Sequence, residues 1–449
     1  MIPATTNWVN AAGGASLSLV HILSFASYPR IFYASQVKPT GANTYPWIAA
    51  IQGGGMTGDV LQGTASNAAL SVEVIDYQQA LTADIASTIF EGMTCTLTSG
   101  FTSLASTSDY ITYGHYVVDS VETTSSNLRY RFNLRDKGLK FDQYVYSTGD
   151  DGYLTAKQHP RTVTGNPMAI LNDVLINQLG YTSADVNTSV LSSYQSTLFT
   201  GLTMVFHITQ PSQAKTWLKQ EIFDPLAGYG FWNSAGQYTP HFILPQTQPS
   251  VQQTVIDHPT IASQAGIESP LPVMGVGQFC AEMLTMMDYD GQNYNTGVGS
   301  EYSPGITRYG LQDMRPKQSR GLLSPLGGAV YARIAQYAGF RRYGLKPRIL
   351  KCIASWPAVR LELGDLVYVT HPLIPNKYTG AMGLSNNWFE VQGNSPNWMA
   401  GTVNLDLIDV QYENNPVLQI APDGTPNWAG SSGAQRATYG YANEGQNIY

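Results

Sequence analysis

Seven histidines are the residues of this 449-residue chain best suited to acid–base or metal chemistry. They occur singly, without the HxH or HExxH spacing that places two imidazoles on one metal ion. Three of them precede a proline, which favours turn geometry. The spacing therefore predicts no catalytic histidine and no local metal site. The seven are His21, His115, His159, His207, His241, His258 and His371, and those before proline are His159, His258 and His371.

Two acidic pairs stand beside glycines. Residues 288–293 read DYDGQN and place Asp288 and Asp290 near Gly291. In an EF-hand the glycine is the sixth residue and a glutamate the twelfth, whereas here the glycine is the fourth. A strand end followed by a turn is the favoured interpretation. Asp150–Asp151 are adjacent, so their side chains point apart on an extended chain, and we expect a turn there too.

Thiol and nucleotide chemistry have little support. The three cysteines, Cys95, Cys280 and Cys352, are odd in number and far apart, which excludes a disulfide framework or a CxxC knuckle. We expect buried thiols in a reducing compartment. The glycine clusters Gly53–Gly55 and Gly327–Gly328 lack the lysine and the strand–helix context of a phosphate loop. The sequence thus predicts no catalytic, cofactor-binding or metal-binding residue and no cofactor.

Composition favours strands and argues against nucleic-acid binding. Charged residues are 12% of the chain, the net charge is −7, and 43 Gly, 25 Pro and 28 Tyr favour turns and half-buried strands. No Lys/Arg run exceeds Arg341–Arg342, so the sequence shows no basic cluster that would neutralise phosphates. The apolar stretch Leu17–Phe25 is shorter than the roughly 20 residues of a membrane span. We expect about three domains and neither a signal peptide nor a membrane span.

The first 146 residues should be strands. In 128–135, apolar residues alternate with Arg and Asn, which is the period of a strand with one buried face. We predict further strands at 71–75, 94–97 and 116–121, divided by Gly, Ser and Thr turns. Together they indicate a sandwich or barrel.

The remainder reads as a mixture of helices and strands. Helices are predicted at 167–179 and 212–223 and a hairpin at 231–244, which makes a small α/β domain. Residues 245–320 read mostly as connection, with a linker at 245–253 and one strand at 277–287. After these come a helix at 326–340 and four strands, and beyond Tyr412 the composition is too polar to build a core. The four strands are at 348–353, 358–361, 366–370 and 401–410.

Four motifs together resemble phage tail hub proteins, the hubs of long-tailed phages and gene transfer agents, which are related to the baseplate hubs of contractile tails. The most specific lies in 331–376 and contains LELGDLVYVTHP; the others occur in the same order as in that family. The resemblance spans about residues 60–412. The other three motifs are GNPMAILNDVLINQLG at 165–180, its companion helix at 215–226, and the tyrosines of 288–289, 302–303 and 309–310.

The resemblance implies a mainly β protein with α+β parts, in which two β-barrel hub domains surround the tail lumen and small α/β domains intervene. It implies a non-enzymatic structural protein of the virion tail tip, made in the host cytoplasm, that joins the tail tube to the distal tip and lines the DNA exit channel. The domains would be 1–160 (first barrel), 161–250 (small α/β), 251–315 (connecting, peripheral), 316–412 (helix and second barrel) and 413–449 (low-complexity tail).

The same resemblance implies partners. Three copies of the chain would form a homotrimer that contacts tube or distal tail proteins on one side and tail fibre or central spike proteins on the other, with no sequence-specific nucleic-acid binding. By family analogy, a cysteine that joins ligands of a neighbouring chain around an iron–sulfur cluster stays open beside the ordinary buried thiol.

Two alternatives stay open. The first is a tail-associated cell-wall or polysaccharide hydrolase, for which the aromatic segments 386–388 and 397–398 could stack on sugars, although turn packing is favoured for both. It would also require two carboxylates about 5–9.5 Å apart. The second is a receptor-binding tail module.

Overall fold

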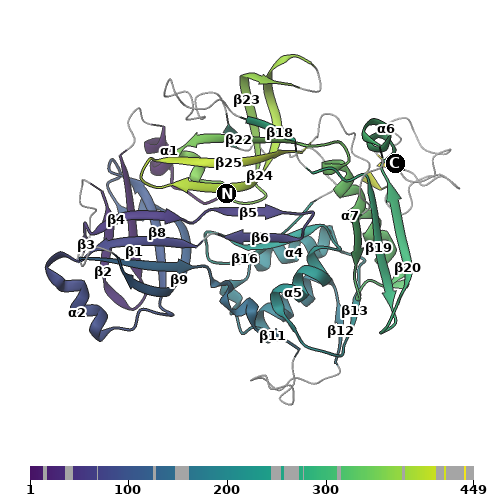
Figure 1. Ribbon diagram of the computed structural model, residues 1–449, viewed down its shortest axis with the longest axis horizontal. Coiled ribbons are helices and arrows are strands. Elements are labelled where there is room, and N and C mark those ends of the chain that lie inside the picture. The colour runs from purple at the N-terminus through teal and green to yellow at the C-terminus, as the bar shows by residue number, and fades with distance from the viewer. Residues whose placement is uncertain are drawn as a thin grey trace.

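The computed structural model describes residues 1–13, 18–35, 44–67, 69–124, 128–146, 161–243, 254–256, 273–276, 278–310, 315–376, 380–410, 419–420 and 439–440. Two large sheets dominate, with α/β elements between and beside them (Figure 1). The prediction of a mainly β protein with α/β parts is therefore confirmed.

The first sheet comes from the N-terminal part of the chain. In β10, Phe132 and Leu134 are buried, while Arg131 on the other face pairs with Glu73 at 2.6 Å. The alternation predicted for this strand is confirmed, as are strands at the other three predicted positions. The order is β3-β2-β1-β8-β9-β10-β7-β4, with β1 (Leu19–Phe25), β2 (Tyr28–Ala34), β3 (Thr44–Tyr45), β4 (Ile48–Gly53), β7 (Leu70–Ile75), β8 (Thr94–Phe101), β9 (Ile111–Thr123) and β10 (Arg129–Arg135).

The second sheet is mostly C-terminal, and a hairpin from the N-terminal part, β5 and β6, is added to it at β24. The predicted strand at 358–361 is wrong: Trp356–Arg360 form a 3₁₀ turn, η10, because Pro357 suits a first turn but not a sheet ladder. The order is β17-β23-β24-β25-β22-β18, with β5 (Met56–Asp59), β6 (Thr64–Asn67), β17 (Thr254–Ile256), β18 (Val273–Val276), β22 (Arg348–Ser355), β23 (Leu366–Pro375), β24 (Met382–Asn397) and β25 (Thr402–Asp409).

Six strands of each sheet follow one plan. In chain order, β1, β4, β7, β8, β9 and β10 match β17, β18, β22, β23, β24 and β25. In space, β4-β7-β10-β9-β8-β1 matches β18-β22-β25-β24-β23-β17. The pairing directions agree except at one edge, where β17 runs parallel to β23 but β1 runs antiparallel to β8. We call each set a six-strand unit.

The bulges of the two units also correspond. The fifth strand of each unit carries one extra residue against the sixth strand: Asp119 in β9 and Gln392 in β24. It carries another against the fourth strand, at Tyr113 in β9 and at the left-handed Asn386 in β24. Because bulges raise the local twist of a strand, the two units are bent at the same places.

The two expected barrels are not closed by hydrogen bonds among the described residues. The first ladder ends at β3 and β4 and the second at β17 and β18. In the first sheet β2 nevertheless lies against β4, so the sheet curls almost onto itself.

An α/β region follows the first sheet. Pro167 opens α3, and the Asn166 side chain caps it by accepting from the Met168 backbone at 3.0 Å, which confirms the predicted helix. The helix predicted at 212–223 begins only at Ala214. The elements are η3 (Lys137–Asp142), β11 (Tyr144–Val145), β12 (Arg161–Gly165), α3 (Pro167–Asp173) with the π-turn η5 (Val174–Gln178), η6 (Ser183–Asp185), α4 (Thr188–Thr197), β13 (Met204–Ile208), β14 (Ser212–Gln213), α5 (Ala214–Leu218) with the π-turn η7 (Lys219–Phe223), β15 (Gly228–Trp232) and β16 (Tyr238–Phe242).

A second α/β region lies inside the second six-strand unit, between β18 and β22. The expectation that 245–320 is mostly connection is wrong, because this region holds a three-stranded sheet, β20-β19-β21, that packs against α7. The predicted strand at 277–287 begins only at Glu282, and the helix predicted at 326–340 is confirmed. The elements are β19 (Glu282–Tyr289), β20 (Tyr294–Glu301), α6 (Ser303–Tyr309), β21 (Arg315–Gln318), η9 (Ser324–Leu326) and α7 (Gly328–Tyr343).

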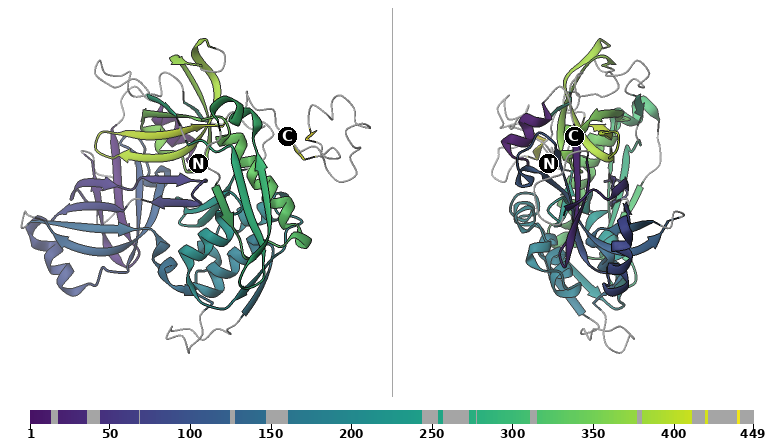
Figure 2. Two further views of the ribbon diagram at one scale, coloured as in Figure 1. Left: turned by 45° about the vertical axis from the view of Figure 1, so that its right-hand side comes forward. Right: turned by 90° about the vertical axis from the view of Figure 1, so that its left-hand side faces the viewer.

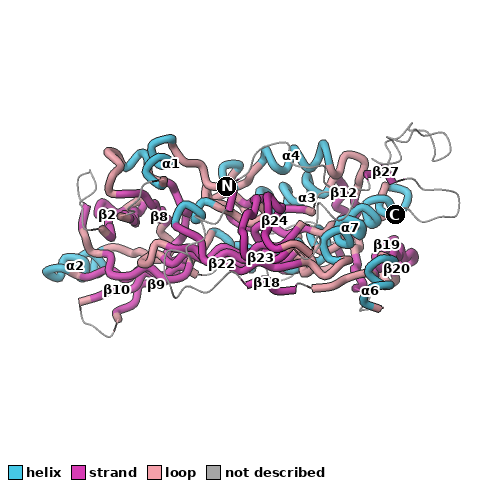
Figure 3. The backbone as a smooth tube through the Cα atoms, turned by 90° about the horizontal axis from the view of Figure 1, so that it is seen from above, coloured by secondary structure: helices cyan, strands magenta, loops and turns pink. Residues whose placement is uncertain are grey.

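The molecule is elongated: the first sheet lies at one end and β19, β20 and α6 lie at the other (Figure 3). The β23–β24 hairpin projects from the body (Figure 2). The proposed linker 245–253 and most of the tail from 413 lie outside the described residues. No described helix is long and apolar enough to cross a membrane. The remaining elements are α1 (Thr6–Ala12), η1 (Tyr77–Gln79), α2 (Ala80–Ser87), η2 (Thr107–Asp109), β26 (Gln419–Ile420) and β27 (Tyr439–Gly440).

Candidate functional site

The two sheets meet at a junction that combines a shared hydrophobic core, backbone pairing and a cluster of aromatic rings. One hydrophobic core runs through both, with Leu23 and Val72 of the first sheet in the same cluster as Leu350 and Val391 of the second. Burial of such side chains stabilises by about 1.5–3 kcal/mol each, so this shared core holds the two sheets together.

The β5–β6 hairpin ties the sheets together by backbone pairing. It leaves the first sheet after β4 and pairs with β24, where Met56 lies opposite Asn394 and Thr57 opposite Gly393. Gly53 has a φ of +81°, and a side chain there would meet the Ala69 carbonyl at 2.0 Å. The first glycine of the 53–55 cluster therefore allows the sharp exit from β4 that sends the hairpin across.

Aromatic rings fill the space beneath this hairpin. His21 lies 5.3 Å from the ring centroids of both Trp356 and Trp398. The Trp398 indole donates to the Gly53 carbonyl at 3.0 Å, and the Tyr113 hydroxyl donates to the Gly54 carbonyl at 2.6 Å. Residues from both ends of the chain thus fix the turn from which the hairpin starts. We call His21, Tyr113, Trp356 and Trp398 the junction cluster.

Burial dominates the electrostatics of the junction cluster. It lowers the pKa of His21 to about 4, although a contact of 3.1 Å between Nε2 and the Trp398 carbonyl acts in the opposite direction. Burial likewise raises the pKa of Tyr113. Both side chains are therefore neutral at pH 7, which suits an aromatic joint rather than proton transfer.

A buried ion pair joins α7 to the second sheet. Arg342 donates two hydrogen bonds to the Glu390 carboxylate, at 2.6 and 2.8 Å. Burial by itself would raise the pKa of Glu390, but Arg342 and His241, whose Nε2 lies 3.4 Å away, outweigh it and bring the pKa to about 2. A second buried pair, Arg348 with Asp409, links β22 to β25. These charges serve structural contacts.

The histidines considered from sequence are spread over the fold. His159 and His258 lie outside the described residues. The turn expected at His371 is instead a bulged part of β23, where its Nδ1 accepts from the Leu373 backbone at 3.1 Å. The described histidines lie on five separate strands, which are β1 for His21, β9 for His115, β13 for His207, β16 for His241 and β23 for His371.

The carboxylates considered from sequence make structural hydrogen bonds, Asp288 at the end of β19 to the start of η9 and Asp290 within the following turn. Asp288 accepts from the Ser324 backbone at 2.7 Å, and Asp290 accepts from the backbones of Gln292 and Asn293 at 2.9 and 2.8 Å. The predicted strand end followed by a turn is confirmed here. Asp150–Asp151 lie outside the described residues.

The cysteines and tryptophans of interest are buried. Cys95, Cys280 and Cys352 are free and buried, as predicted, and burial raises the pKa of Cys95 and Cys352 to about 12.

The idea of an exposed aromatic platform is wrong, because Trp388 and Trp398 are each only 2% exposed. Trp388 belongs to β24 and lies against Tyr368 of β23. Trp398 lies in the turn that follows β24, so the favoured turn packing is confirmed there and is wrong only for Trp388.

No protein-family model and no curated protein matches this sequence. The structure is similar to the 43 kDa tail protein of prophage MuSo2 from Shewanella oneidensis, at 10% identity and a TM-score of 0.48, over 87% of this chain and 99% of that one. It is similar to a tail protein from Neisseria meningitidis, at 10% and 0.48, over 88% and 97%. It is also similar to prophage tail protein gp18 from Listeria monocytogenes, at 8% and 0.40, over 80% and 94%. All three are named as tail proteins, the class to which the sequence motifs are similar.

Proposed function

We propose that this chain is a structural hub of a phage-type tail tip, which joins the tail tube to distal fibre or spike proteins and lines the channel through which DNA leaves. The observation that carries the proposal is the repeated six-strand unit. Two units with the same strand order and corresponding bulges, held on one core, give each chain two similar surfaces at a fixed angle.

The repeat supports a homotrimer. Three chains with two units each present six similar surfaces. Six surfaces can each contact one subunit of a sixfold tube ring, so no symmetry mismatch arises. The junction cluster and the β5–β6 hairpin would set the rotation from one unit to the next within a chain. A contact between chains would continue that rotation and close the ring.

The charge supports a channel that DNA passes through. With a net charge of −7 and only 12% charged residues, the chain has few groups with which to hold phosphates. Low charge also suits large subunit contacts, whose centres are poor in charged side chains. The tube or distal tail proteins and the fibre or spike proteins are the proposed partners.

The hydrolase alternative loses its sugar platform, because Trp388 and Trp398 are buried. Asp290 accepts hydrogen bonds within its own turn, and Asp288 accepts from Ser324 at the start of η9. The structural role therefore accounts for more of the observations.

Labelling the protein in purified particles tests the proposal. An epitope inserted in the exposed turn of residues 290–293, between β19 and β20, should bind gold-labelled antibody at the distal end of the tail. A known tube protein carrying the same epitope is the control and should label the whole length. Label along the whole tail, or absence of the protein from purified particles, would overturn the proposed role.

A further inference from the structure

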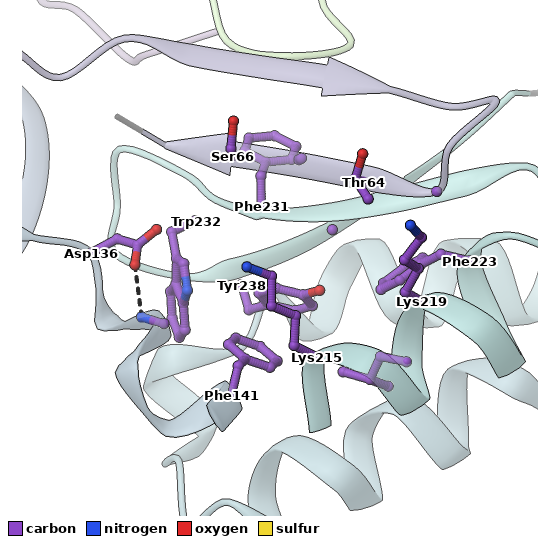
Figure 4. Close-up of a pocket in the computed structure, with 15 residues that line it drawn as sticks. Thr64, Ser66, Asp136, Phe141, Lys215, Lys219, Phe223, Phe231, Trp232 and Tyr238 are labelled. Atoms are coloured by element: carbon purple, nitrogen blue, oxygen red, sulfur yellow. Dashed lines mark hydrogen bonds between the residues drawn. The ribbon is translucent and has the colours of Figure 1, made fainter. Parts of the chain in front are cut away.

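A pocket of about 250 Å³ lies between the β5–β6 hairpin and the first α/β region (Figure 4). Strand β6 forms one side with Thr64, Ala65 and Ser66, and α5 with η7 forms the other. Aromatic rings line its inner wall, with Phe141 and Trp232 at 5.0 and 5.6 Å from the ring of Tyr238. The wall therefore offers flat apolar surface to a ring.

Two lysines stand at the mouth of this pocket. Lys215 and Lys219 are four residues apart and share one helical face, and both extend from the helix toward β6 (Figure 4). Neither forms an ion pair with a carboxylate in the part of the chain that the structure describes. The pocket thus combines an apolar wall with two available cations.

A third donor lines the same pocket. The Trp232 indole N–H is buried and finds no acceptor within the described residues. The one carboxylate of the lining, Asp136, accepts from the Gly138 backbone at 2.9 Å and so holds the start of η3. The donors that lack partners therefore favour an acceptor-bearing, negatively charged ligand.

The size of the pocket limits what enters. Sites for drug-sized ligands and cofactors occupy about 300–1,000 Å³, so this pocket suits one or two side chains rather than a nucleotide or an oligosaccharide. Side chains of that size are the anchors by which protein partners bind.

We propose that this pocket binds a segment of a partner protein in which an aromatic side chain stands beside a carboxylate. The ring would stack against Tyr238 and Phe141, and the carboxylate would accept from Lys215 and Lys219. This inference goes beyond the proposed hub role, because the pocket would bind such a segment whether or not the chain is part of a tail.

Titration of the full chain with short peptides tests the inference. The probe is acetyl-Glu-Phe-amide, with acetyl-Gln-Phe-amide and acetyl-Glu-Ala-amide as matched controls that lack the charge or the ring. Binding is read from the indole N–H resonances of the tryptophans, with Trp232→Phe to assign the one of interest. We expect a saturable shift of the Trp232 resonance and at least about tenfold weaker binding of each control. No shift, or equal binding of the uncharged control, would refute the inference.

Charge variants locate the binding. Lys215→Gln and Lys219→Gln should each weaken the probe severalfold, whereas Lys351→Gln, an exposed lysine on β22, should not change it. All three should melt like the parent chain, because none of these lysines is buried. Equal affinity in all variants would place the probe elsewhere and overturn the proposal. Particle labelling is independent of this result, so the two proposals fail separately.

Discussion

Arg342 and Glu390 show how this protein holds charge in its interior. Both are buried, and the fork of the guanidinium meets both carboxylate oxygens. Removing one partner leaves an uncompensated buried charge, which typically costs about 3–5 kcal/mol. Arg342→Met should therefore lower the urea midpoint strongly, and circular dichroism at increasing urea concentration checks this.

A double variant separates the charge from the packing. Arg342→Met with Glu390→Met should recover much of the lost stability, because a well-packed apolar pair can replace a buried ion pair. Lys351→Met is the control, since its ammonium lies 3.8 Å from Asp406 on an exposed surface and such pairs contribute about 0–1 kcal/mol. An Arg342→Met variant as stable as the control would contradict the structural role of the pair.

His21 makes the junction sensitive to acid. Its pKa is lowered from 6.5 to about 4 in the fold, so the unfolded chain takes up the proton first as pH falls. The contribution of neutral His21 to the free energy of unfolding is therefore fully present above about pH 6.5. It decreases by about 3 kcal/mol as the pH falls to 4. Melting temperatures measured between pH 7 and pH 4 should fall accordingly.

His21→Phe is the matched variant for this test. It keeps a ring between Trp356 and Trp398 but cannot be protonated, so its melting temperature should fall less over the same range. Parallel curves for the two proteins would show that His21 does not carry the acid sensitivity.

Residue patterns predicted turns and buried side chains correctly, whereas the proposed sugar-binding aromatic residues were wrong. The turn at Asp290 and the buried cysteines follow from local rules of hydrogen bonding and spacing. The burial of Trp398 does not, because it depends on His21 and Tyr113, which come from strands near the other end of the chain. Trp388 lies in β24 against Tyr368 of the neighbouring strand β23. The junction cluster joins His21 to Trp398, 377 positions away, and a sequence pattern carries no information on such a meeting.

At the scale of elements, β23 confirms the strand predicted at 366–370. Val367 and Val369 are fully buried in it, and Gly364, with a φ of +81°, makes the tight bend before it as predicted. Val367→Asp would bury an unpaired charge and should cost about 3 kcal/mol or more. Asn404→Asp, at an exposed position of β25, is the control. Solubility and melting measurements on the two variants decide, and normal behaviour of the first would contradict its core position.

Strands β20 and β24 escaped prediction for physical reasons. In β20, Gly297 and Gly299 occupy the exposed face, and glycine is unfavourable within a strand, so the composition indicates a loop although the burial alternates. In β24, bulges at Asn386 and Gln392 shift the period of two, and the polar residues between them resemble a loop. Tertiary pairing on both sides makes β24 a strand despite that composition.

The projecting β23–β24 hairpin is the element best placed for a partner. Leu373 and Met382 are 58% and 73% exposed on it. Leu373→Asp with Met382→Asp should leave the melting temperature unchanged, because neither side chain is packed, and should reduce incorporation into tails. The quantity of the protein in purified particles measures this. Unchanged incorporation would show that the hairpin faces solvent in the assembly.

At the scale of the whole molecule, the repeated unit was visible only in the structure. The sequence indicated two β regions but not their common strand order, because the two units carry different insertions. The short β5–β6 hairpin follows β4, the second strand of the first unit. A three-stranded sheet and α7 follow β18, the second strand of the second unit. Residues 254–256 and 273–276, expected in a connecting region, supply two strands of the second unit. Long-range pairing of such short segments leaves no local pattern.

The common plan leads to a count of chains. If the two units take equivalent places around a sixfold tube, each tail should hold three copies of this protein, and the contact between chains should be heterologous, with the first unit of one chain against the second unit of the next. Such head-to-tail contacts close into a ring only at one rotation, and within a chain the junction cluster fixes that rotation. Quantitative mass spectrometry of purified tails, calibrated on a tube protein present at six copies per ring, should give one chain of this protein for every two tube subunits of a ring. A ratio of one to one would mean that a single unit of each chain faces the tube, and the second unit would then need another partner.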